Sequence, residues 1–306
     1  MIKKVEGEMN GTKEMSEKHF IDAKILNDYL ENNINAYEGP LNIEEFIGGQ
    51  SNPTYLLKTP SASYVLRRKP PGNLLKSAHA VDREYRVISA LNNTNVPVPK
   101  AYLHCEDESL IGTEFFVMEF INGSVIWDPD IPHGTNSDRT QIYESMNKTI
   151  KRLHKVDPIK IGLEDFGKPG NYVGRQVARW SKQYELSETE KIPAMDSLIQ
   201  WLPKNLPSEK PTRLVHGDFS LTNVIVNNDS NEIASILDWE LSTLGDPIAD
   251  FSYHCLRYLD NPVLSNEQEC LRLGIPTYKD YVKMYFEGSD FDLSLIHISE
   301  PTRPTP

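Results

Sequence analysis

Three side chains that carry oxygen atoms lie within one stretch of the chain, residues 214–240. Asn223 follows Asp218 by five positions, and Asp238 follows it by twenty. Between Asn223 and Asp238, two short apolar runs flank a polar turn, which is the pattern of a β-hairpin whose ends would bring both residues together. Phosphoryl transfer requires such a set, because a carboxylate receives the proton of the acceptor hydroxyl and oxygen ligands hold Mg²⁺ on the nucleotide phosphates. The spacing therefore predicts Asp218 as the catalytic base and Asn223 and Asp238 as metal ligands.

Each of these residues also has a purely structural interpretation. An Asp that follows a glycine often bonds its own backbone in a turn, and an Asn or Asp beside a strand or helix often caps it. The three residues together at this spacing favour the catalytic interpretation. We expect His216 to support the loop through hydrogen bonds rather than to act as a base, because Asp218 already fills that role.

A glycine-rich turn between two expected strands is a candidate for covering the nucleotide phosphates with backbone N–H groups. Two adjacent glycines are a weak signal, and an ordinary hairpin turn is the alternative. The residues of this turn that we assign to the nucleotide are Gly48, Gly49, Gln50, Ser51 and Asn52.

The expected strand at residues 62–69 carries two adjacent arginines, Arg67 and Arg68. Strand alternation places their side chains on opposite faces of the sheet. We choose Arg67 as the cation that faces the phosphates, because it directly follows an apolar run and its guanidinium can hold two phosphate oxygens. Glu84, on the following helix, is its expected partner. Arg68 is expected to lie on a solvated basic edge.

The segment that joins the two expected lobes is the last part of the nucleotide site. Backbone groups of Glu119 and Ile121 are in a position to bond the edge of an adenine, and the alternative is a buried strand with an exit turn. Farther along the chain, Asp246 precedes a proline as a helix N-cap, and Asp250 follows one turn later. We expect structural roles for both, with a substrate contact by Asp246 as the alternative. His154 is expected to be a core or helix-end residue.

Hydrophobic periodicity and the placement of glycine and proline indicate the elements that must position these residues. Before residue 121, a helix at residues 16–34 precedes five strands and an amphipathic helix at residues 78–93. Beyond residue 121, helices are expected to surround the short hairpin. Their ranges are residues 137–155, 171–186, 190–202, 247–258 and 277–286. The fold class is therefore α+β, with a small antiparallel-sheet N-lobe and a mainly helical C-lobe.

The chain divides into four segments. Residues 1–14 are polar and expected to be flexible, residues 15–121 form the N-lobe that binds the nucleotide, and residues 122–292 form the C-lobe with the catalytic loop and the acceptor site. Residues 293–306 end in a proline-rich run and are expected to be a non-native tail.

Composition excludes several classes of protein. Of the 306 residues 39% are hydrophobic, and the net charge is −12, which favours a globular protein and disfavours a nucleic-acid binder. No apolar run approaches the roughly 20 residues that a membrane-spanning helix needs. The three cysteines lack metal-binding or redox spacing, and no secretory pattern opens the chain. A cytoplasmic location is therefore expected, with a mitochondrial or peroxisomal one as the alternative.

Several motifs resemble a known family. "HGDFSLTN" is similar to the catalytic loop of the aminoglycoside phosphotransferase and choline kinase-like family, and "LDWE" is similar to its metal-binding acidic segment. "GGQSNPTY", "YVLRRKPPG", "AHAVDREY" and "LDWELSTLGDPIADF" resemble more narrowly the kinase-type domain of acyl-CoA dehydrogenase family members ten and eleven. This resemblance extends from about residue 15 to residue 290.

The resemblance implies a protein-kinase-like fold that uses ATP and Mg²⁺. It implies Asp218 as the base, Asn223 and Asp238 on the metal, and Arg67 where most kinases have lysine, with Glu84 as its partner. The implied acceptor is an alcohol, either a hydroxylated acyl-CoA or a hydroxy acid, and the implied partner is an acyl-CoA dehydrogenase domain outside this chain. The alternatives are an amino-alcohol or aminoglycoside acceptor, and a non-catalytic nucleotide-binding module that is truncated or a pseudokinase.

Overall fold

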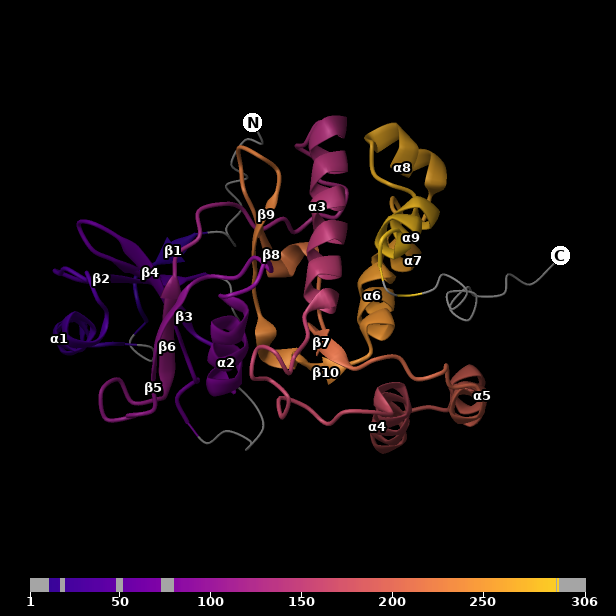
Figure 1. The fold of residues 1–306 in the computed structure, drawn as a ribbon, viewed down its shortest axis with the longest axis horizontal. Helices are drawn as coiled ribbons and strands as arrows, with labels where there is room; N and C mark the ends of the chain where they lie inside the picture. The colour runs from indigo at the N-terminus through magenta and orange to yellow at the C-terminus, as the bar shows by residue number, and fades with distance from the viewer. Residues whose placement is uncertain (1–10, 17–19, 48–51, 73–79, 290, 292–306) are drawn as a thin grey trace.

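The computed structural model of the protein describes residues 11–16, 20–47, 52–72, 80–289 and 291. A sheet-rich N-lobe and a helical C-lobe lie side by side, and helix α2 stands between the sheet and the C-lobe hairpin (Figure 1). This is the predicted α+β arrangement of two lobes. Among the described residues, no helix is both long and apolar enough to cross a bilayer.

The N-lobe is built on one antiparallel sheet with the strand order β1-β2-β3-β4-β6-β5. The predicted five strands are present, and a sixth, β1, pairs Thr12 with Phe46 inside the segment that we expected to be flexible. Two helices complete the lobe. The bounds are β1 Thr12–Lys13, β2 Asn42–Phe46, β3 Thr54–Lys58, β4 Ser63–Arg68, β5 Ala101–Cys105, β6 Phe115–Glu119, α1 Ala23–Asn33 and α2 Val81–Leu91.

Helix α1 begins later than the periodicity predicts. The apolar pattern suggested a start near residue 16, but the Asp22 side chain accepts hydrogen bonds from the N–H groups of Lys24 (2.9 Å) and Ile25 (3.1 Å). Because these bonds satisfy N–H groups that have no partner within the helix, Asp22 defines the N-terminus.

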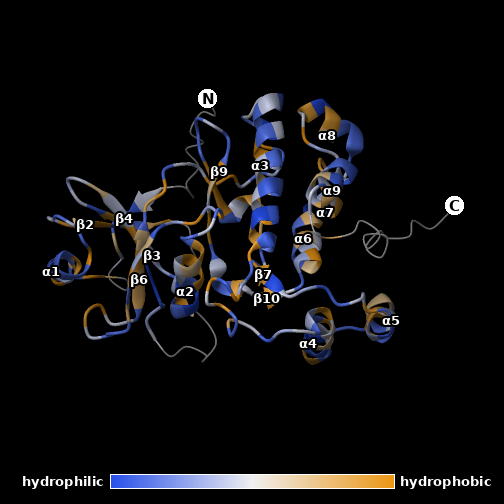
Figure 2. Cartoon of the chain, viewed as in Figure 1, coloured by the Kyte–Doolittle hydropathy of each residue, from blue (hydrophilic) through white to orange (hydrophobic). Residues whose placement is uncertain are grey.

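The sheet is covered on both faces. Val65 of β4 belongs to the core shared with α2 and the C-lobe, whereas Tyr64 and Leu66 belong to a second core shared with α1. This is the alternation predicted for the strand. Strand β6 lies inside the sheet and is mostly hydrophobic along its length, while α3 shows a hydrophilic outer surface (Figure 2).

Arg68 is buried, contrary to the prediction that it lies on a solvated edge. Its side chain is on the α1 face of β4 and is 2% exposed. Nη1 donates to the Ile111 carbonyl (3.0 Å), and the guanidinium lies 5.3 Å from the centre of the Tyr55 ring. The carbonyl and the aromatic ring offset part of the cost of burying this charge, while Arg68 Nε is buried without a hydrogen-bond partner among the described residues.

The C-lobe combines helices with two short antiparallel ladders. The predicted hairpin is present as β8 and β9, with Val224 opposite Ile236, and a second ladder pairs β7 with β10. The predicted helix at residues 247–258 is interrupted at Leu256 and forms α6 and α7. The bounds are α3 Asn136–Lys155, α4 Tyr172–Ser187, α5 Pro193–Trp201, η2 Leu202–Lys204, β7 Arg213–Val215, η3 Leu221–Asn223, β8 Val224–Val226, β9 Ile233–Ile236, η4 Trp239–Leu241, β10 Thr243–Gly245, α6 Pro247–Cys255, α7 Arg257–Asp260, α8 Glu267–Leu273 and α9 Tyr278–Phe286.

The connector between the lobes is bonded to the hairpin. Ser124 and Val226 exchange two backbone hydrogen bonds, each of 2.9 Å. Gly123 lies so close to this contact that a Cβ atom added to it would be 2.5 Å from the Val226 carbonyl oxygen and 2.4 Å from Ile225 Cγ2. Only glycine permits this approach, so Gly123 lets the connector lie against β8.

We expect Gly123→Ala to destabilise the protein. The added methyl group must push the connector away from β8 or break its hydrogen bonds with Ser124, at a cost of about 1–3 kcal/mol. Urea unfolding of the variant and of the unchanged protein measures this difference. An unchanged unfolding midpoint would contradict the close contact between connector and β8.

His254 is a polar group inside the C-lobe. Its Nδ1 is 2.9 Å from the Phe219 carbonyl oxygen and its Nε2 is 2.8 Å from the Tyr281 hydroxyl. Because a carbonyl only accepts, Nδ1 carries the proton and Nε2 accepts from the tyrosine. Burial lowers the pKa of His254 from its ordinary value to about 4, so the imidazole is neutral at neutral pH.

This shift makes the stability of the fold depend on pH. Between about pH 6.5 and pH 4 the unfolded chain binds a proton at His254 that the folded protein does not bind. The free energy of unfolding therefore falls as the pH falls through this window, by about 1–2 kcal/mol from pH 7 to pH 5. Urea unfolding at a series of pH values measures the slope. It should be smaller in His254→Gln and unchanged in His133→Gln, whose side chain is exposed.

Candidate active site

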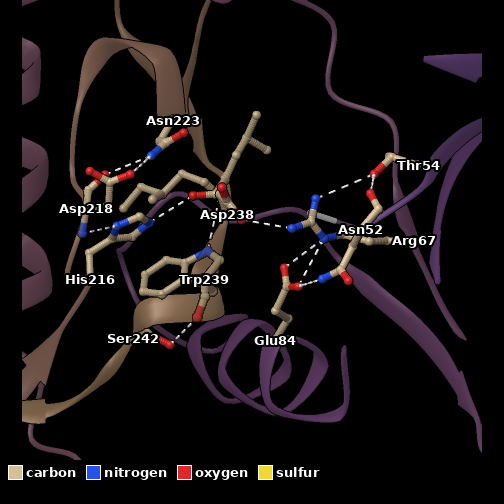
Figure 3. A network of polar contacts seen from close by, with 12 residues as sticks. Asn52, Thr54, Arg67, Glu84, His216, Asp218, Asn223, Asp238, Trp239 and Ser242 are labelled. Atoms are coloured by element: carbon tan, nitrogen blue, oxygen red, sulfur yellow. Dashed lines mark hydrogen bonds and ion pairs between the residues drawn. The ribbon is translucent and has the colours of Figure 1, made fainter. Parts of the chain in front are cut away.

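One arginine joins the two lobes. Arg67, on β4, places Nε 2.9 Å from Glu84 Oε2 and Nη2 2.8 Å from Asp238 Oδ1 (Figure 3). Glu84 belongs to α2 in the N-lobe, whereas Asp238 follows β9 in the C-lobe. The structure thus brings together the cation and the two carboxylates that were selected from three separate segments of the sequence.

The Arg67–Glu84 pair is largely removed from water. The side chain of Arg67 is 12% exposed and that of Glu84 is 2% exposed. Burial alone would lower the pKa of Arg67, but the charges of Glu84 and Asp238 outweigh it and the pKa is raised. Arg67 therefore remains a cation with fixed orientation, which is the condition for binding phosphate oxygens.

Asn52 supports this pair from the side of the glycine-rich turn. It is fully buried, and its Nδ2 donates to Glu84 Oε1 (2.8 Å). Its side chain is therefore bonded to the partner of Arg67, and the assignment of its backbone N–H to the phosphates stays a prediction. The other residues of that assignment, Gly48, Gly49, Gln50 and Ser51, lie outside the described part of the chain.

The catalytic loop between β7 and η3 positions Asp218. Asn223 Nδ2 donates both to the Asp218 backbone carbonyl (2.8 Å) and to its Oδ2 (2.9 Å). Gly217, directly before it, has φ +86°, and a Cβ atom there would lie 2.8 Å from the Leu241 carbonyl oxygen. The turn therefore requires glycine, and it presents the Asp218 carboxylate beside Asn223.

The hairpin brings Asn223 and Asp238 to the same end, as predicted. The Leu237 N–H donates to the Asn223 carbonyl (2.8 Å), so the residue before Asp238 is bonded to Asn223. Asp238 adopts φ 60° and ψ 63°, a left-handed conformation that Asp tolerates better than most residues. Its side chain is 34% exposed and lies between the catalytic loop and Arg67 (Figure 3).

His216 supports the catalytic loop through hydrogen bonds of its imidazole ring. It is fully buried, its Nε2 is 2.8 Å from the Leu237 carbonyl oxygen, and its Nδ1 accepts from the Asp218 N–H (3.2 Å). The imidazole thus carries its proton on Nε2 and joins the backbone before Asp238 to the backbone of Asp218. This agrees with the predicted structural role.

A buried carboxylate fixes the start of the same loop. Asp250 accepts from the N–H groups of His216 (2.9 Å) and Gly217 (2.8 Å), and His154 Nε2 lies 3.0 Å from its Oδ2. The other ring nitrogen of His154 is 2.6 Å from the Tyr285 hydroxyl. Burial opposes the charge of Asp250, but the bond from His154 and the nearby imidazoles outweigh it and lower the pKa. Asp250 and His154 therefore have the structural roles that we expected.

Two further predicted residues occupy ordinary structural positions. Asp246 caps α6 by accepting from the N–H groups of Ile248 (2.8 Å) and Ala249 (3.2 Å). Glu119 ends β6, and its N–H donates to the Lys100 carbonyl (2.8 Å). This N–H is therefore used within the N-lobe, and the predicted adenine contacts of Glu119 and Ile121 would need other backbone groups of the connector.

The surroundings of Asp218 favour its protonated form more than water does. Burial is the largest effect and raises the pKa of the carboxyl, and the negative charge of Asp238 acts in the same direction. The hydrogen bond from Asn223 opposes both. A carboxylate with a raised pKa is a stronger base toward a hydroxyl proton.

A metal ion has a suitable donor set here. Asn223 uses its amide nitrogen toward Asp218, which leaves its side-chain oxygen for a cation, and Asp238 adds a carboxylate. Among the described residues, no three His, Cys, Asp or Glu side chains form a metal-binding group. Two protein oxygens suit Mg²⁺, which takes most of its ligands from phosphates and water.

A cavity of about 160 Å³ opens beside the catalytic loop. Sequence reasoning missed it, because its walls come from the connector, α3, the catalytic loop, α6 and α7, and no local pattern links these segments. Most of the wall is apolar or aromatic. The lining residues are Trp127, Pro129, Tyr143, Met146, Ser220, Leu221, Thr222, His254, Arg257, Tyr258, Asn261 and Leu264.

Residues 42–278 match the family model described as the phosphotransferase enzyme family. The chain is 47% identical over 266 residues to acyl-CoA dehydrogenase family member 10 of Mus musculus, covering 85% of this chain and 25% of that protein. It is 39% identical over 295 residues to family member 11 of Rattus norvegicus, covering 93% of this chain and 38% of that protein. The chain thus spans between a quarter and two fifths of the length of these relatives.

Solved structures show the same fold. A protein of Ralstonia eutropha, provisionally assigned as an aminoglycoside phosphotransferase, superposes with a TM-score of 0.82 at 45% identity, covering 89% of this chain and 82% of its own. Macrolide 2′-phosphotransferase MphH of Brachybacterium faecium superposes with a TM-score of 0.61 at 18% identity, covering 89% and 86%. The chain therefore belongs to the phosphotransferase enzyme family and has the kinase-like fold of the aminoglycoside phosphotransferases.

Proposed function

We propose that the chain is an ATP- and Mg²⁺-dependent phosphotransferase that moves the γ-phosphate to an alcohol. The observation that carries this proposal is the sharing of Arg67 between Glu84 and Asp238, at 2.9 Å and 2.8 Å, beside Asp218 and Asn223. A cation for the phosphates, two oxygens for a metal and a base lie around one site. The completeness of this set argues against a non-catalytic nucleotide-binding module.

In the proposed reaction Asp218 receives the proton of the acceptor hydroxyl. The oxygen of that hydroxyl forms a bond to the γ-phosphorus, and the bond from this phosphorus to the oxygen bridging to the β-phosphate breaks. ADP leaves with the electron pair of that bond. Asn223 orients Asp218 through its bond to Oδ2 (2.9 Å), so that the base faces the acceptor in a fixed position.

The remaining site residues would hold the nucleotide. Arg67 would bind phosphate oxygens, and the connector at Glu119 and Ile121 would contact the adenine. Asn223 and Asp238 would hold Mg²⁺, which neutralises charge on the phosphates when it is bound.

The cavity beside Ser220 is the proposed acceptor site, and its charge bears on the acceptor class. Among the described lining residues, Arg257 is the one cation, none is a carboxylate, and His254 is neutral because burial lowers its pKa to about 4. Asp246 and Asp250, the acids that would suit a cationic acceptor, are engaged in the bonds described above. This supports an acceptor with an apolar body and an anionic group over an amino alcohol or aminoglycoside.

A hydroxy acid or a hydroxylated acyl-CoA has this combination of an apolar chain, a hydroxyl and negative charge. Relatives at 47% and 39% identity are named as acyl-CoA dehydrogenase family members, which supports an acyl-type acceptor and a dehydrogenase domain as partner. Arg257 has a side chain 63% exposed, and its contact with Asp260 (3.8 Å) is long and weak, so its charge remains accessible to a ligand.

Replacing Asp218 with Asn tests the reaction. We expect kcat to fall by a factor of about 10²–10⁴, because the amide cannot accept the hydroxyl proton. Binding of ADP with Mg²⁺ should remain within a few-fold, since Asp218 does not contact Arg67 or Glu84. ADP release with a panel of hydroxy acids and hydroxyacyl-CoAs measures the first quantity, and calorimetry measures the second.

The matched control is Asp229→Asn, which makes the same chemical change at an exposed position in the hairpin turn. It should leave kcat unchanged. ADP release that is absent with every acceptor, or that is equal in the unchanged protein and Asp218→Asn, would refute the proposed reaction.

Replacing Arg257 with Gln tests the acceptor class. We expect KM for an anionic hydroxy acid to rise about tenfold or more, because a charge-assisted hydrogen bond contributes about 1.5–3 kcal/mol. KM for an uncharged alcohol of the same chain length should not change. Arg272→Gln is the control, since that side chain is 64% exposed and lies outside the cavity lining. An equal rise in KM for both acceptors would show that Arg257 does not select charge.

A further inference from the structure

We propose that Arg83 is a positioning residue of the nucleotide site, which holds α2 and the segment of Asp238 at the separation that lets Arg67 bind two carboxylates. This inference rests on the proposed function. Arg83 contacts none of the expected nucleotide-binding residues in its described bonds, and it acts on them through the two elements that it joins.

The contacts of Arg83 cross from the N-lobe to the C-lobe. Its Nη2 lies 2.8 Å from the Phe166 carbonyl oxygen and 3.3 Å from the Ser242 carbonyl oxygen. The guanidinium also lies 4.0 Å from the centre of the Phe166 ring. A planar cation that donates to two carbonyls and stacks on a ring is held in one orientation, which a more flexible side chain would not reproduce.

The position of Arg83 in α2 connects these contacts to the ion pair. Adjacent residues on a helix point about 100° apart, so Glu84 turns toward the sheet and Arg67 while Arg83 turns toward the C-lobe. A shift of α2 away from the C-lobe would therefore move Glu84 together with Arg83. The bond to the Phe166 carbonyl sets the distance of Glu84 from the C-lobe.

The bond from Arg83 to the Ser242 carbonyl acts on Asp238, the second carboxylate that Arg67 binds. Ser242 ends the short turn that starts at Asp238, and both its N–H (3.0 Å) and its Oγ (2.5 Å) donate to the Trp239 carbonyl. Trp239 is 1% exposed, and the centre of its ring lies 4.8 Å from the centre of the His216 ring. The segment from Asp238 to Ser242 is thus a compact unit seated on the C-lobe core, and Arg83 bonds its last residue.

The two carboxylates of Arg67 come from different lobes, and its guanidinium must reach both at hydrogen-bond distance. A change of about 1 Å in the separation of α2 and the turn would stretch one of these bonds beyond the range in which it is strong. Arg83 bridges these two elements, so we assign to it the role of keeping the separation constant.

The test is binding of phosphate-bearing and phosphate-free ligands to Arg83→Gln. We expect affinity for ADP with Mg²⁺ to fall about tenfold, because Arg67 and Asp238 no longer have fixed positions. Affinity for adenosine should stay within twofold, because the described contacts of Arg83 are with Phe166 and Ser242 and not with the connector. A general loosening of the N-lobe would weaken both ligands equally and would overturn the inference.

Two variants control for stability and for position. Arg86→Gln removes an exposed arginine of the same helix that bonds Asp165 and the Gly162 carbonyl but not Ser242, and it should leave the ADP affinity within twofold because Arg83 still joins α2 to the segment of Asp238. Arg83→Lys keeps the charge but not the fork or the stacking, and it should give an intermediate loss. Thermal unfolding of each variant establishes that it is folded, and Arg83→Lys serves as the test if Arg83→Gln is not.

A double-mutant cycle with Glu84→Gln identifies the route of the effect. If Arg83 acts through the ion pair, Arg83→Gln should weaken ADP binding much less in the Glu84→Gln background than in the unchanged protein. Fully additive losses, or an Arg83→Gln affinity equal to that of the unchanged protein, would overturn this inference alone. If the protein without any substitution binds no ADP, the proposed function is overturned, and this inference is overturned with it.

Discussion

The site depends on one cation shared by two lobes. Arg67 is largely buried, and its charge is maintained because Glu84 of the N-lobe and Asp238 of the C-lobe both bond its guanidinium. Removing either carboxylate would leave a charge in the interior without a full set of partners, which costs far more than an exposed ion pair contributes. The relative placement of sheet, α2 and hairpin is thus constrained by the requirement to keep this arginine satisfied.

A second constraint shapes the catalytic loop: its buried backbone N–H and C=O groups must have hydrogen-bond partners. The loop lies against the C-lobe core, and Asp250 supplies acceptors for two of its N–H groups while His216 bonds the Asp218 N–H and the Leu237 carbonyl. A loop that is bonded in this way holds Asp218 in one place without help from a substrate. The polar interior of the C-lobe thereby stabilises the fold and holds Asp218 in position.

Much of this arrangement could be predicted from sequence, and the reasons are local. The alternation of β4 predicted correctly that Arg67 and Arg68 lie on opposite faces of the sheet, and turn residues between two apolar runs predicted the hairpin that joins Asn223 to the segment of Asp238. Two lobes of the expected types followed from the same periodicities. These features depend on residues that are near one another in the chain.

The features that escaped prediction depend on contacts between distant segments. Arg68 was expected in solvent, and only the fold reveals that Tyr55 and the Ile111 carbonyl cover it. Strands β7 and β10 have three residues each, too few to show a period. The cavity beside Ser220 and the contacts of Arg83 have no local signature, because each combines elements far apart in sequence.

The β7–β10 ladder has a consequence for how the site forms. It pairs Val215 with Thr243, and the chain between these two residues forms one loop that contains Asp218, Asn223 and Asp238. The β8–β9 hairpin lies within this loop and adds a second set of strand contacts to it. Closing such a loop costs chain entropy once, and the contacts within it are gained together. Asp218, Asn223 and Asp238 therefore become ordered as a single cooperative unit, and a folded state in which only some of them are in place is not favoured.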